Sequence, residues 1–354
     1  MSTTTGRQRE ITRRVMRKRR KRRRRMLKTI LLFFLLILVA SCVVLIIYNK
    51  KGGSFEDTID TYKIAREFSF DIASLDKPRA DSFASDLVIV TKNVPLDTVS
   101  LEPGQKGLLL DLTRRNVMYS QSAFEKVYPA SITKLMTAIL AFKYGNMDQM
   151  VTISEADVEL EENSQVVGFQ PGDRATMEQL VNCLLVYSGN DAACAIAETV
   201  GGSMDNFVSM MNSYAASLGC TGTHFMNPHG LHDDNHYTTP YDIYLMLKEA
   251  LKYPRFTEIT QLSSYKIVYK RADGTDVETI LEATDHYLTG EATPPRNVKI
   301  LGGKTGTTSL AGNCLALLAQ NAYGEPYVSI VMGAKEKDVL YSQMNSLLQN
   351  INAA

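Results

Sequence analysis

A run of twenty uncharged, mostly apolar residues near the N-terminus, Thr29–Tyr48, places the strongest constraint on how this 354-residue chain can fold. At about 1.5 Å per residue, a helix of that length spans the roughly 30 Å hydrocarbon core of a bilayer. Residues 1–28, just before it, are strongly basic and include the unbroken Lys/Arg run Arg17–Arg25. Because basic segments stay on the cytoplasmic side, we expect a single-pass cell-membrane anchor that leaves the remaining chain extracytoplasmic.

Cleavage of this anchor is a separate question. Val39-Ala40-Ser41-Cys42 resembles a bacterial lipoprotein cleavage box, in which Cys42 would carry the lipid. The apolar run continues through Ile47, whereas a lipoprotein usually turns polar at that point, and a secretory signal has a shorter apolar stretch. The pattern therefore favours an uncleaved signal anchor, and either outcome leaves the body tethered.

The charges are segregated between the two parts of the chain. Of 39 Lys/Arg and 38 Asp/Glu residues, 16 and one respectively lie in residues 1–51, which leaves 23 basic and 37 acidic residues, a net charge of −14, in residues 52–354. Such a body is a poor partner for nucleic acid, whose phosphates require a basic surface. We interpret the N-terminal basic run as a topology signal that contacts lipid headgroups, with a nucleic-acid arm as the alternative.

Beyond the anchor, residues 49–86 show no repeat and predict an extracytoplasmic stalk, whereas residues 87–354 have the pattern of a compact domain. A predicted hairpin is followed by helices, then by strands and a last helix. This order favours an α+β fold, an antiparallel sheet with a helical subdomain. The predicted elements are strands at Gly107–Asp111, Val117–Ser120, Val298–Gly303, Cys314–Ala319 and Tyr327–Gly333, and helices that start near Ser131, Thr176, Ser203, Thr239 and Lys337.

The five cysteines are too few for a scaffold built on disulfides. Cys183, Cys194 and Cys314 lie on apolar stretches of predicted elements, so buried free thiols are expected. The sequence contains no C-x-x-C pair, and a structural zinc site is therefore not expected.

The pattern Ser-x-x-Lys occurs three times and is uninformative without its context. Ser74–Lys77 lies in the stalk before a proline, and Ser263–Lys266 lies in a segment that alternates like an exposed strand. Only Ser131–Lys134 begins a predicted helix with apolar residues to bury it. Residues three apart share a helix face, so the Lys134 amine can reach the Ser131 hydroxyl. A lysine whose pKa is lowered by burial or by other cations can take the serine proton, which makes the serine a nucleophile.

Two further motifs follow Ser131 in order, Ser188-Gly189-Asn190 in a predicted loop and Lys304-Thr305-Gly306 at a predicted strand end. Each is weak alone, but the ordered set resembles that of class A β-lactamases and penicillin-binding proteins. From about Gly107 onward, the residues around these motifs are similar to the D-alanyl-D-alanine carboxypeptidases, the low-molecular-mass penicillin-binding proteins. The similar stretches are Tyr128–Ala138, Ser188–Ala193, Asn227–Leu231 with His236 and Thr238-Thr239, and Gly303–Thr308 with Ala311-Gly312.

The resemblance implies a β-lactamase/D,D-peptidase-like fold for the catalytic domain, residues 87–354. It also implies an enzyme that removes the terminal D-alanine of peptidoglycan stem peptides, binds β-lactam antibiotics covalently, and needs no metal or cofactor. Ser131 would attack the carbonyl between the two D-alanines, with Lys134 as general base. Ser188 would pass a proton to the departing D-alanine, and Asn190 would orient Lys134 and bind the substrate amide.

The resemblance also implies that the third motif binds the substrate. Lys304, with Thr305, Gly306 and Thr307, would bind the terminal carboxylate, because a cation beside hydroxyl donors suits that anion. The backbone N–H groups of Ser131 and Thr307 would form the oxyanion hole. Many members carry a further C-terminal β-domain and an amphipathic C-terminal anchor. Here the chain ends soon after the catalytic fold, so the N-terminal segment is expected to provide the tether.

Three alternatives use the same fold. A class A β-lactamase needs an E-x-x-L-N stretch between the second and third motifs, and residues 191–303 contain none. A D,D-endopeptidase or transpeptidase stays open, because pocket shape rather than motif decides the acceptor. A catalytically silent wall-binding protein is disfavoured, since the serines, lysines and asparagine of all three motifs are present.

A metal peptidase is the alternative from a different class. Four histidines and two aspartates lie close together in the sequence: His224, His229, His232, His236, Asp233 and Asp234. The spacing of a zinc peptidase, such as H-E-x-x-H, is absent. A polar loop over Asn227–His236 is the favoured interpretation.

Overall fold

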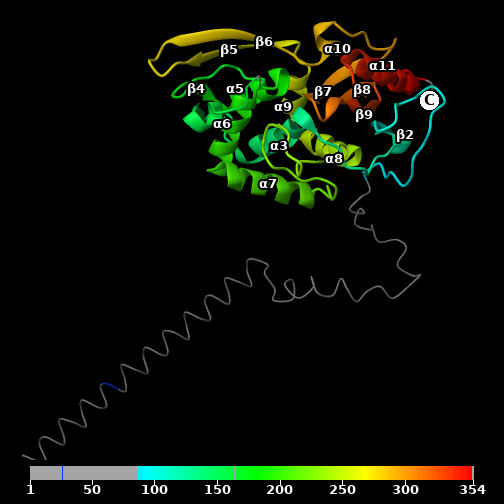
Figure 1. The fold of residues 1–354 in the computed structure, drawn as a ribbon, viewed down its shortest axis with the longest axis horizontal. Coiled ribbons are helices and arrows are strands. Elements are labelled where there is room, and N and C mark those ends of the chain that lie inside the picture. The colour runs from blue at the N-terminus through cyan, green and yellow to red at the C-terminus, as the bar shows by residue number, and fades with distance from the viewer. Residues whose placement is uncertain (1–25, 27–85, 163, 353–354) are drawn as a thin grey trace, which may run out of the picture. The chain divides into compact units, whose positions relative to one another are not determined.

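The computed structural model describes residue 26, residues 86–162 and residues 164–352 (Figure 1). The chain divides into two units, Met1–Asp81 and Ser82–Ala354, and almost all described residues belong to the second. The predicted anchor, residues 29–48, and nearly all of the predicted stalk lie outside the described residues. Within the described part of the chain, no helix has both the length and the apolar character needed to cross a membrane.

A five-stranded antiparallel sheet, in the order β2-β1-β9-β8-β7, forms the centre of the second unit. Successive side chains of a strand point to opposite faces, so Leu108 and Leu110 enter one hydrophobic core and Leu109 enters the other. β7 is the outer strand on the side that carries the third motif. The strands are β1 (Lys106–Asp111), β2 (Asn116–Gln121), β7 (Lys299–Thr308), β8 (Gly312–Gln320) and β9 (Pro326–Ala334).

Different helices cover the two faces of this sheet (Figure 1). The C-terminal helix α11 (Lys337–Leu348) packs on β8 and β9 and buries Leu340, Met344 and Leu347 in the smaller core. On the opposite face, α8 (Pro240–Ala250) contacts β1 and β9. Helix α8 begins where the sequence predicts, because the Thr239 hydroxyl caps it and Pro240 occupies its first turn.

The helical subdomain lies between β2 and β7 in the chain. Its central helix, α3, contacts α6, α7 and α8 and is buried along most of its length. A second antiparallel sheet, in the order β3-β4-β5-β6, completes this half. The elements are α3 (Lys134–Tyr144), β3 (Met150–Thr152), α4 (Glu155–Val158), β4 (Arg174–Thr176), α5 (Met177–Asn182), α6 (Asn190–Gly201), α7 (Met204–Ser217), α9 (Pro254–Thr260), β5 (Ser264–Lys270), β6 (Asp276–Glu282) and α10 (His286–Thr289), with short 3-10 turns at Ala130–Thr133 and Gln349–Asn352.

The predicted α+β fold is confirmed, and so are the hairpin, the three C-terminal strands and the last helix. Two local predictions are wrong. Ser131 does not open the α-helix but lies in the 3-10 turn that precedes it. The helix predicted to start near Thr176 is α-helical only to Asn182, and the chain continues as a π-helical turn, Cys183–Tyr187. The second sheet was not predicted, because β3 and β4 have only three residues each. Such strands are too short to show an alternation of apolar and polar residues in the sequence.

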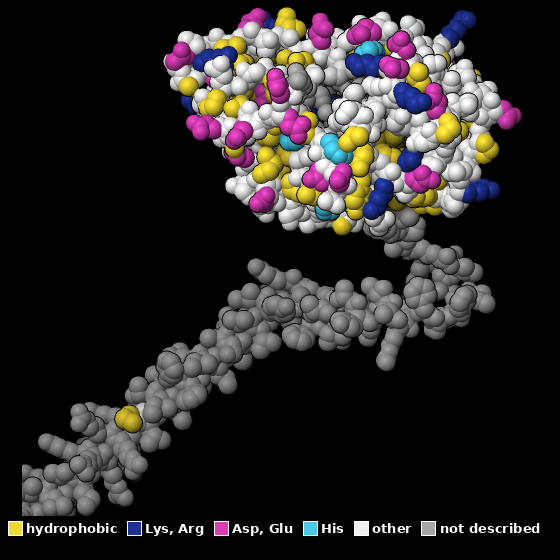
Figure 2. All heavy atoms as spheres, in the orientation of Figure 1, with side chains coloured by type: hydrophobic (Ala, Val, Ile, Leu, Met, Phe, Trp, Pro, Cys, Tyr) yellow, Lys and Arg dark blue, Asp and Glu magenta, His cyan; other side chains and the backbone are white. Residues whose placement is uncertain are grey.

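The cysteines and surface charges complete this description. Cys183, Cys194 and Cys314 are buried and free, as expected, and Cys220, for which no burial was predicted, is buried and free as well. On the face shown in Figure 2, acidic and basic side chains are interspersed. No continuous basic surface of the kind that phosphates require is visible on that face.

Candidate active site

Ser131 is held in a strained turn between the sheet and α3. Ala130, just before it, has φ 47°, a left-handed conformation that side-chain-bearing residues seldom adopt. The turn is fixed from beneath by the Thr133 hydroxyl, which donates to the Ala130 carbonyl at 2.8 Å. Strain at a residue next to a nucleophile persists only where the surroundings over-determine it. The turn thus presents a half-exposed Ser131 above a fully buried helix start.

Lys134 lies directly below this serine with its side chain fully buried. Its Nζ is 3.0 Å from Ser131 Oγ, 2.7 Å from Asn190 Oδ1 and 2.8 Å from the His229 carbonyl oxygen. Two of these partners only accept hydrogen bonds, and the third is a hydroxyl. A neutral amine has two N–H donors and one lone pair, so this set of contacts suits it, with the lone pair toward Ser131.

The electrostatics of Lys134 favour the same neutral form. Burial lowers the pKa of Lys134 well below its usual value, and the neighbouring Lys304 ammonium lowers it further. Removing water from around an ammonium group destabilises the charged state, and a nearby like charge adds to that effect. The lysine is therefore placed and tuned to accept the Ser131 proton.

The second motif begins with another left-handed residue. Ser188 has φ 72° and follows the π-helical turn, which re-aims the chain so that α6 starts at Asn190. Asn190 reaches Lys134 through Oδ1, and its backbone N–H donates to the Gln165 carbonyl at 2.7 Å. The motif therefore connects the nucleophile's base to the loop that carries Gln165.

Lys304 projects from β7 toward Ser188, and its side chain is also buried. Its Nζ donates to Ser188 Oγ and to the Thr305 carbonyl oxygen, each at 3.0 Å. Burial lowers the pKa of Lys304 to about 7, against a smaller opposing effect of the Asp285 carboxylate. The ammonium form has three N–H donors, and these two contacts leave one for a ligand.

Gly306 lets β7 approach the nucleophile turn. A Cβ atom at Gly306 would lie 2.9 Å from the Pro129 carbonyl oxygen and 3.0 Å from both Ser131 N and Ile132 N. Every one of these contacts is with backbone, so no side chain could turn aside to make room. The third motif therefore needs glycine at its third position for steric reasons, which the sequence alone did not reveal.

The three motifs meet at one cavity of about 230 Å³ at the outer strand of the sheet. Ser131, Ser188, Thr305, Gly306 and Thr307 all line it. Lys134 and Lys304 lie beneath it and reach it through the two serines. The structure thus brings together all eight predicted site residues, and of the described residues the Ser263–Lys266 copy of Ser-x-x-Lys does not join them. Ser263–Lys266 lies on and beside β5, where exposed Lys266 pairs with Glu278 at 2.7 Å, and Ser74–Lys77 lies outside the described residues.

Asp191 is a site residue whose role was not predicted. Its buried carboxylate accepts hydrogen bonds from the backbone N–H groups of Val167, Gly168, Phe169 and Ala192, at 2.9–3.3 Å. Burial raises the pKa of Asp191, whereas these N–H donors oppose that change. Asp191 holds the 167–169 loop beside Asn190. Its position directly after the second motif was the only signal in the sequence.

The histidine cluster is occupied by structural contacts. His236 Nε2 lies 2.8 Å from the Thr133 hydroxyl, whose own proton goes to Ala130, and His236 Nδ1 accepts from the Met226 N–H at 3.2 Å. Burial lowers the pKa of His236 to about 4. His229 contributes its carbonyl oxygen to Lys134, and burial lowers the pKa of its ring to about 3. Among the described residues, no group of three or more His, Cys, Asp or Glu side chains is placed to hold a metal ion.

A serine and lysine on one helical turn, completed by a Ser-x-Asn loop and a Lys-Thr-Gly strand, is the arrangement of penicillin-recognising serine enzymes. By its fold and its geometry the chain falls in this class. The family model for D-alanyl-D-alanine carboxypeptidase matches residues 102–336, and the chain belongs to that family. The first-listed curated relative, D-alanyl-D-alanine carboxypeptidase DacF of Bacillus subtilis (strain 168), is 30% identical over 251 residues, which are 69% of this chain and 61% of DacF. The chain thus spans about three fifths of that relative's length.

Solved structures agree on the fold. A D-alanyl-D-alanine carboxypeptidase from Mycobacterium tuberculosis H37Rv aligns with a TM-score of 0.62 at 29% identity, over 73% of this chain and 92% of that one. The Streptomyces K15 DD-transpeptidase aligns with a TM-score of 0.64 at 24% identity, over 73% of this chain and 98% of that one. The second likeness supports the fold alone.

Proposed function

We propose that the chain is a serine-type D-alanyl-D-alanine carboxypeptidase that removes the terminal D-alanine from peptidoglycan stem peptides and is acylated by β-lactams at Ser131. The observation that carries this proposal is the set of contacts at Lys134. A buried amine with two acceptors and one hydroxyl around it is prepared to deprotonate that hydroxyl. Family membership supports the same activity.

Acylation begins when the Lys134 amine takes the Ser131 proton and Oγ attacks the carbonyl between the two D-alanines. The carbonyl oxygen develops negative charge, which the backbone N–H groups of Ser131 and Thr307 stabilise; one such donor contributes on the order of 3–4 kcal/mol. The close packing of Gly306 on the turn brings β7 to Ser131 and supports this arrangement. Asn190 keeps Lys134 in place and binds the substrate amide.

The leaving group needs a proton and the substrate carboxylate needs a cation. Ser188, bonded to Lys304, passes a proton to the departing D-alanine. Lys304, from beneath the cavity, and Thr305, Gly306 and Thr307, which line it, bind the terminal carboxylate. Water then hydrolyses the Ser131 ester and releases the shortened peptide.

The proposal includes a place of action. The basic segment 1–28 stays in the cytoplasm, residues 29–48 span the cell membrane once, and residues 49–86 form a stalk that leaves the catalytic domain, residues 87–354, on the extracytoplasmic side. The sequence pattern supports this topology. Protease treatment of intact spheroplasts tests it, because an extracytoplasmic domain would be digested, whereas a cytoplasmic one would survive until lysis.

The activity is tested by D-alanine release from a diacyl peptide that ends in Lys-D-Ala-D-Ala, with the full-length protein in detergent. We expect release by the wild type and none by Ser131→Ala, together with covalent labelling of the wild type alone by a fluorescent penicillin. Labelling without release would exclude carboxypeptidase activity on that peptide and favour an endopeptidase or transpeptidase. A folded wild type that neither labels nor releases D-alanine would contradict the proposal and favour a silent wall-binding protein.

A further inference from the structure

The proposed function fixes the direction in which a bound peptide runs. Its C-terminal carboxylate lies near Lys304, and its scissile carbonyl lies near Ser131, beside Gly306. β7 runs from Lys304 toward Thr308, so the peptide lies antiparallel to it. The upstream residues of the substrate therefore extend past Thr308, toward the β7–β8 turn. A peptide in extended form advances by about 3.3 Å per residue, so two or three residues carry it beyond the catalytic cavity.

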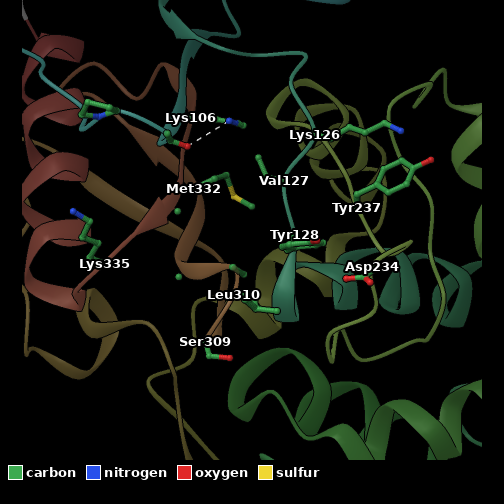
Figure 3. A pocket seen from close by; sticks show the side chains of 15 residues that line it. Lys106, Lys126, Val127, Tyr128, Asp234, Tyr237, Ser309, Leu310, Met332 and Lys335 are labelled. Atoms are coloured by element: carbon green, nitrogen blue, oxygen red, sulfur yellow. Dashed lines mark hydrogen bonds between the residues drawn. The ribbon is translucent and has the colours of Figure 1, made fainter.

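A second and larger cavity, of about 760 Å³, lies at that end of β7 (Figure 3). Ser309 and Leu310 of the β7–β8 turn line it, as does Tyr128, which is three residues before the nucleophile. Figure 3 shows Lys106 and Met332 on one side of this cavity and Lys126 with Tyr237 on the other. We refer to this cavity as the lysine groove. The lysine groove therefore lies next to the C-terminal end of β7 and next to the residues that precede the nucleophile turn.

Three lysines line the groove: Lys106, Lys126 and Lys335. Lys126 lies over the ring of Tyr237, with Nζ 3.6 Å from the ring centroid. Lys106 pairs with Glu125 at 3.1 Å, and Lys335 pairs with Glu102 at 3.3 Å. The carboxylates in these pairs are 65% and 43% exposed. An ion pair whose carboxylate faces solvent in this way is weak, so an incoming carboxylate can replace that partner.

The remaining lining fits the same ligand. One aspartate, Asp234, also lines the groove, but it is 90% exposed and lies 3.3 Å from His232 Nε2. Leu310 is 61% exposed and offers an apolar contact for aliphatic side chains. Residues 52–354 carry an excess of acidic residues overall, yet three lysines meet at this cavity. They face three carboxylates, Asp234 and the ion-pair partners Glu125 and Glu102, and an anionic ligand can displace the last two. Charge complementarity therefore favours a ligand that is both peptidic and anionic.

We infer that the lysine groove binds free carboxylates on the stem-peptide residues upstream of the D-alanyl-D-alanine end, so that the enzyme prefers acidic stem peptides to their amidated forms. This inference rests on the proposed function, because the direction of the peptide does. Lys126 and Lys335 attract the carboxylates, Lys106 contributes from the strand side, and Leu310 contacts the aliphatic part of the diamino acid.

The test compares two pentapeptides of identical sequence that end in D-Ala-D-Ala. One has free carboxylates on its second and third residues, and the other has both amidated; the diacyl-Lys-D-Ala-D-Ala peptide is the short reference. With the full-length wild type in detergent, we expect kcat/KM to be about fivefold higher for the acidic pentapeptide, mainly through KM, as one or two exposed ion pairs would give. The double variant Lys126→Glu/Lys335→Glu should bring this ratio to one or below.

The ratio is insensitive to partial unfolding, because loss of folded enzyme lowers both rates equally. A matched double variant on β5, Lys266→Glu/Lys270→Glu, makes the same change of charge away from the groove and should keep the wild-type ratio. Equal rates for the two pentapeptides, with normal release from the short reference, would overturn the groove assignment and leave the proposed function standing. No release from any of the three peptides would overturn the proposed function and the groove assignment with it.

Discussion

The catalytic cavity and the lysine groove lie at successive positions along one strand, yet they hold their lysines in opposite ways. In the cavity, Lys134 and Lys304 are 0% and 1% exposed, and each is fixed by named hydrogen bonds. In the groove, Lys126 and Lys335 are exposed and contact a ring or a solvent-facing carboxylate. Burial turns an amine into a base of lowered pKa, whereas exposure leaves it a hydrated point charge. The same residue type thus supplies chemistry in one place and attraction in the other.

The largest expected effect comes from replacing the buried base. Lys134→Met should lower the rate of Ser131 acylation by about 10³-fold or more, because among the described residues no other hydrogen-bond partner of Ser131 Oγ can take its proton. Lys134→Arg should fail as badly, because a guanidinium keeps its charge but cannot deprotonate. The measurement is the rate of labelling by a fluorescent penicillin, normalised to the folded fraction from thermal melting. Labelling by Lys134→Arg at a rate near that of the wild type would show that the lysine acts only through its charge.

The next effect concerns the packing that encloses both buried lysines. Gly306→Ala should lower the free energy of unfolding by about 1–3 kcal/mol, because its Cβ would press on the backbone of Pro129, Ser131 and Ile132. The acylation rate per folded molecule should fall as well, because β7 and the nucleophile turn must separate. Denaturant unfolding and penicillin labelling measure the two effects.

Gly274→Ala is the control for the Gly306 variant. Gly274 has φ +88° and open space around its Cβ position, so this change costs only backbone strain of about 1 kcal/mol. It lies in the β5–β6 turn and should leave labelling unchanged. If both alanine variants labelled at the wild-type rate, close approach at Gly306 would matter for stability alone.

Sequence patterns predicted the nucleophile, its base and the other motifs because each combines rare residue types at fixed spacing. They did not predict what makes these residues work. The left-handed conformations of Ala130 and Ser188 depend on tertiary contacts, and neither residue is the glycine that would have signalled them. The carbonyl of His229 is backbone, which no side-chain pattern reveals. The second sheet depends on the long hairpin β5–β6, because β5 pairs with the three-residue strand β4, which in turn pairs with β3.

A pH titration separates the two buried lysines. The Lys304 ammonium adds to the effect of burial in lowering the pKa of Lys134, so Lys304→Met should raise that pKa and move the acid limb of the acylation profile to higher pH. Stability should also respond. The pKa of Lys304 is about 7 in the folded protein and near 10.5 when unfolded, so between these values the unfolded chain binds more protons. Unfolding free energy should therefore rise with pH from about 7 to 10 through this residue.

The difference in slope between the wild type and Lys304→Met measures the contribution of Lys304 together with the accompanying change at Lys134, because Lys134 is the group whose pKa depends on Lys304. Lys304→Arg keeps the charge and should leave the acylation midpoint near that of the wild type, even where the overall rate falls. An unchanged midpoint in Lys304→Met would show that the two amines are too well screened to interact. The charges in the catalytic cavity would then be screened in the same way as the exposed charges in the lysine groove, despite their burial.

The smallest expected effect is the response to salt, which should differ between the lysine groove and the catalytic cavity. Charges in the groove are exposed, and the screening length falls from about 10 Å at 0.1 M salt to about 3 Å at 1 M. The preference for the acidic pentapeptide should therefore fall from about fivefold toward onefold over that range. Penicillin acylation, which depends on buried contacts, should change by less than about twofold. A preference that persists in 1 M salt would mean that the acidic peptide is recognised by buried hydrogen bonds rather than by exposed lysines. An equal salt response in both assays would remove the distinction between the two regions.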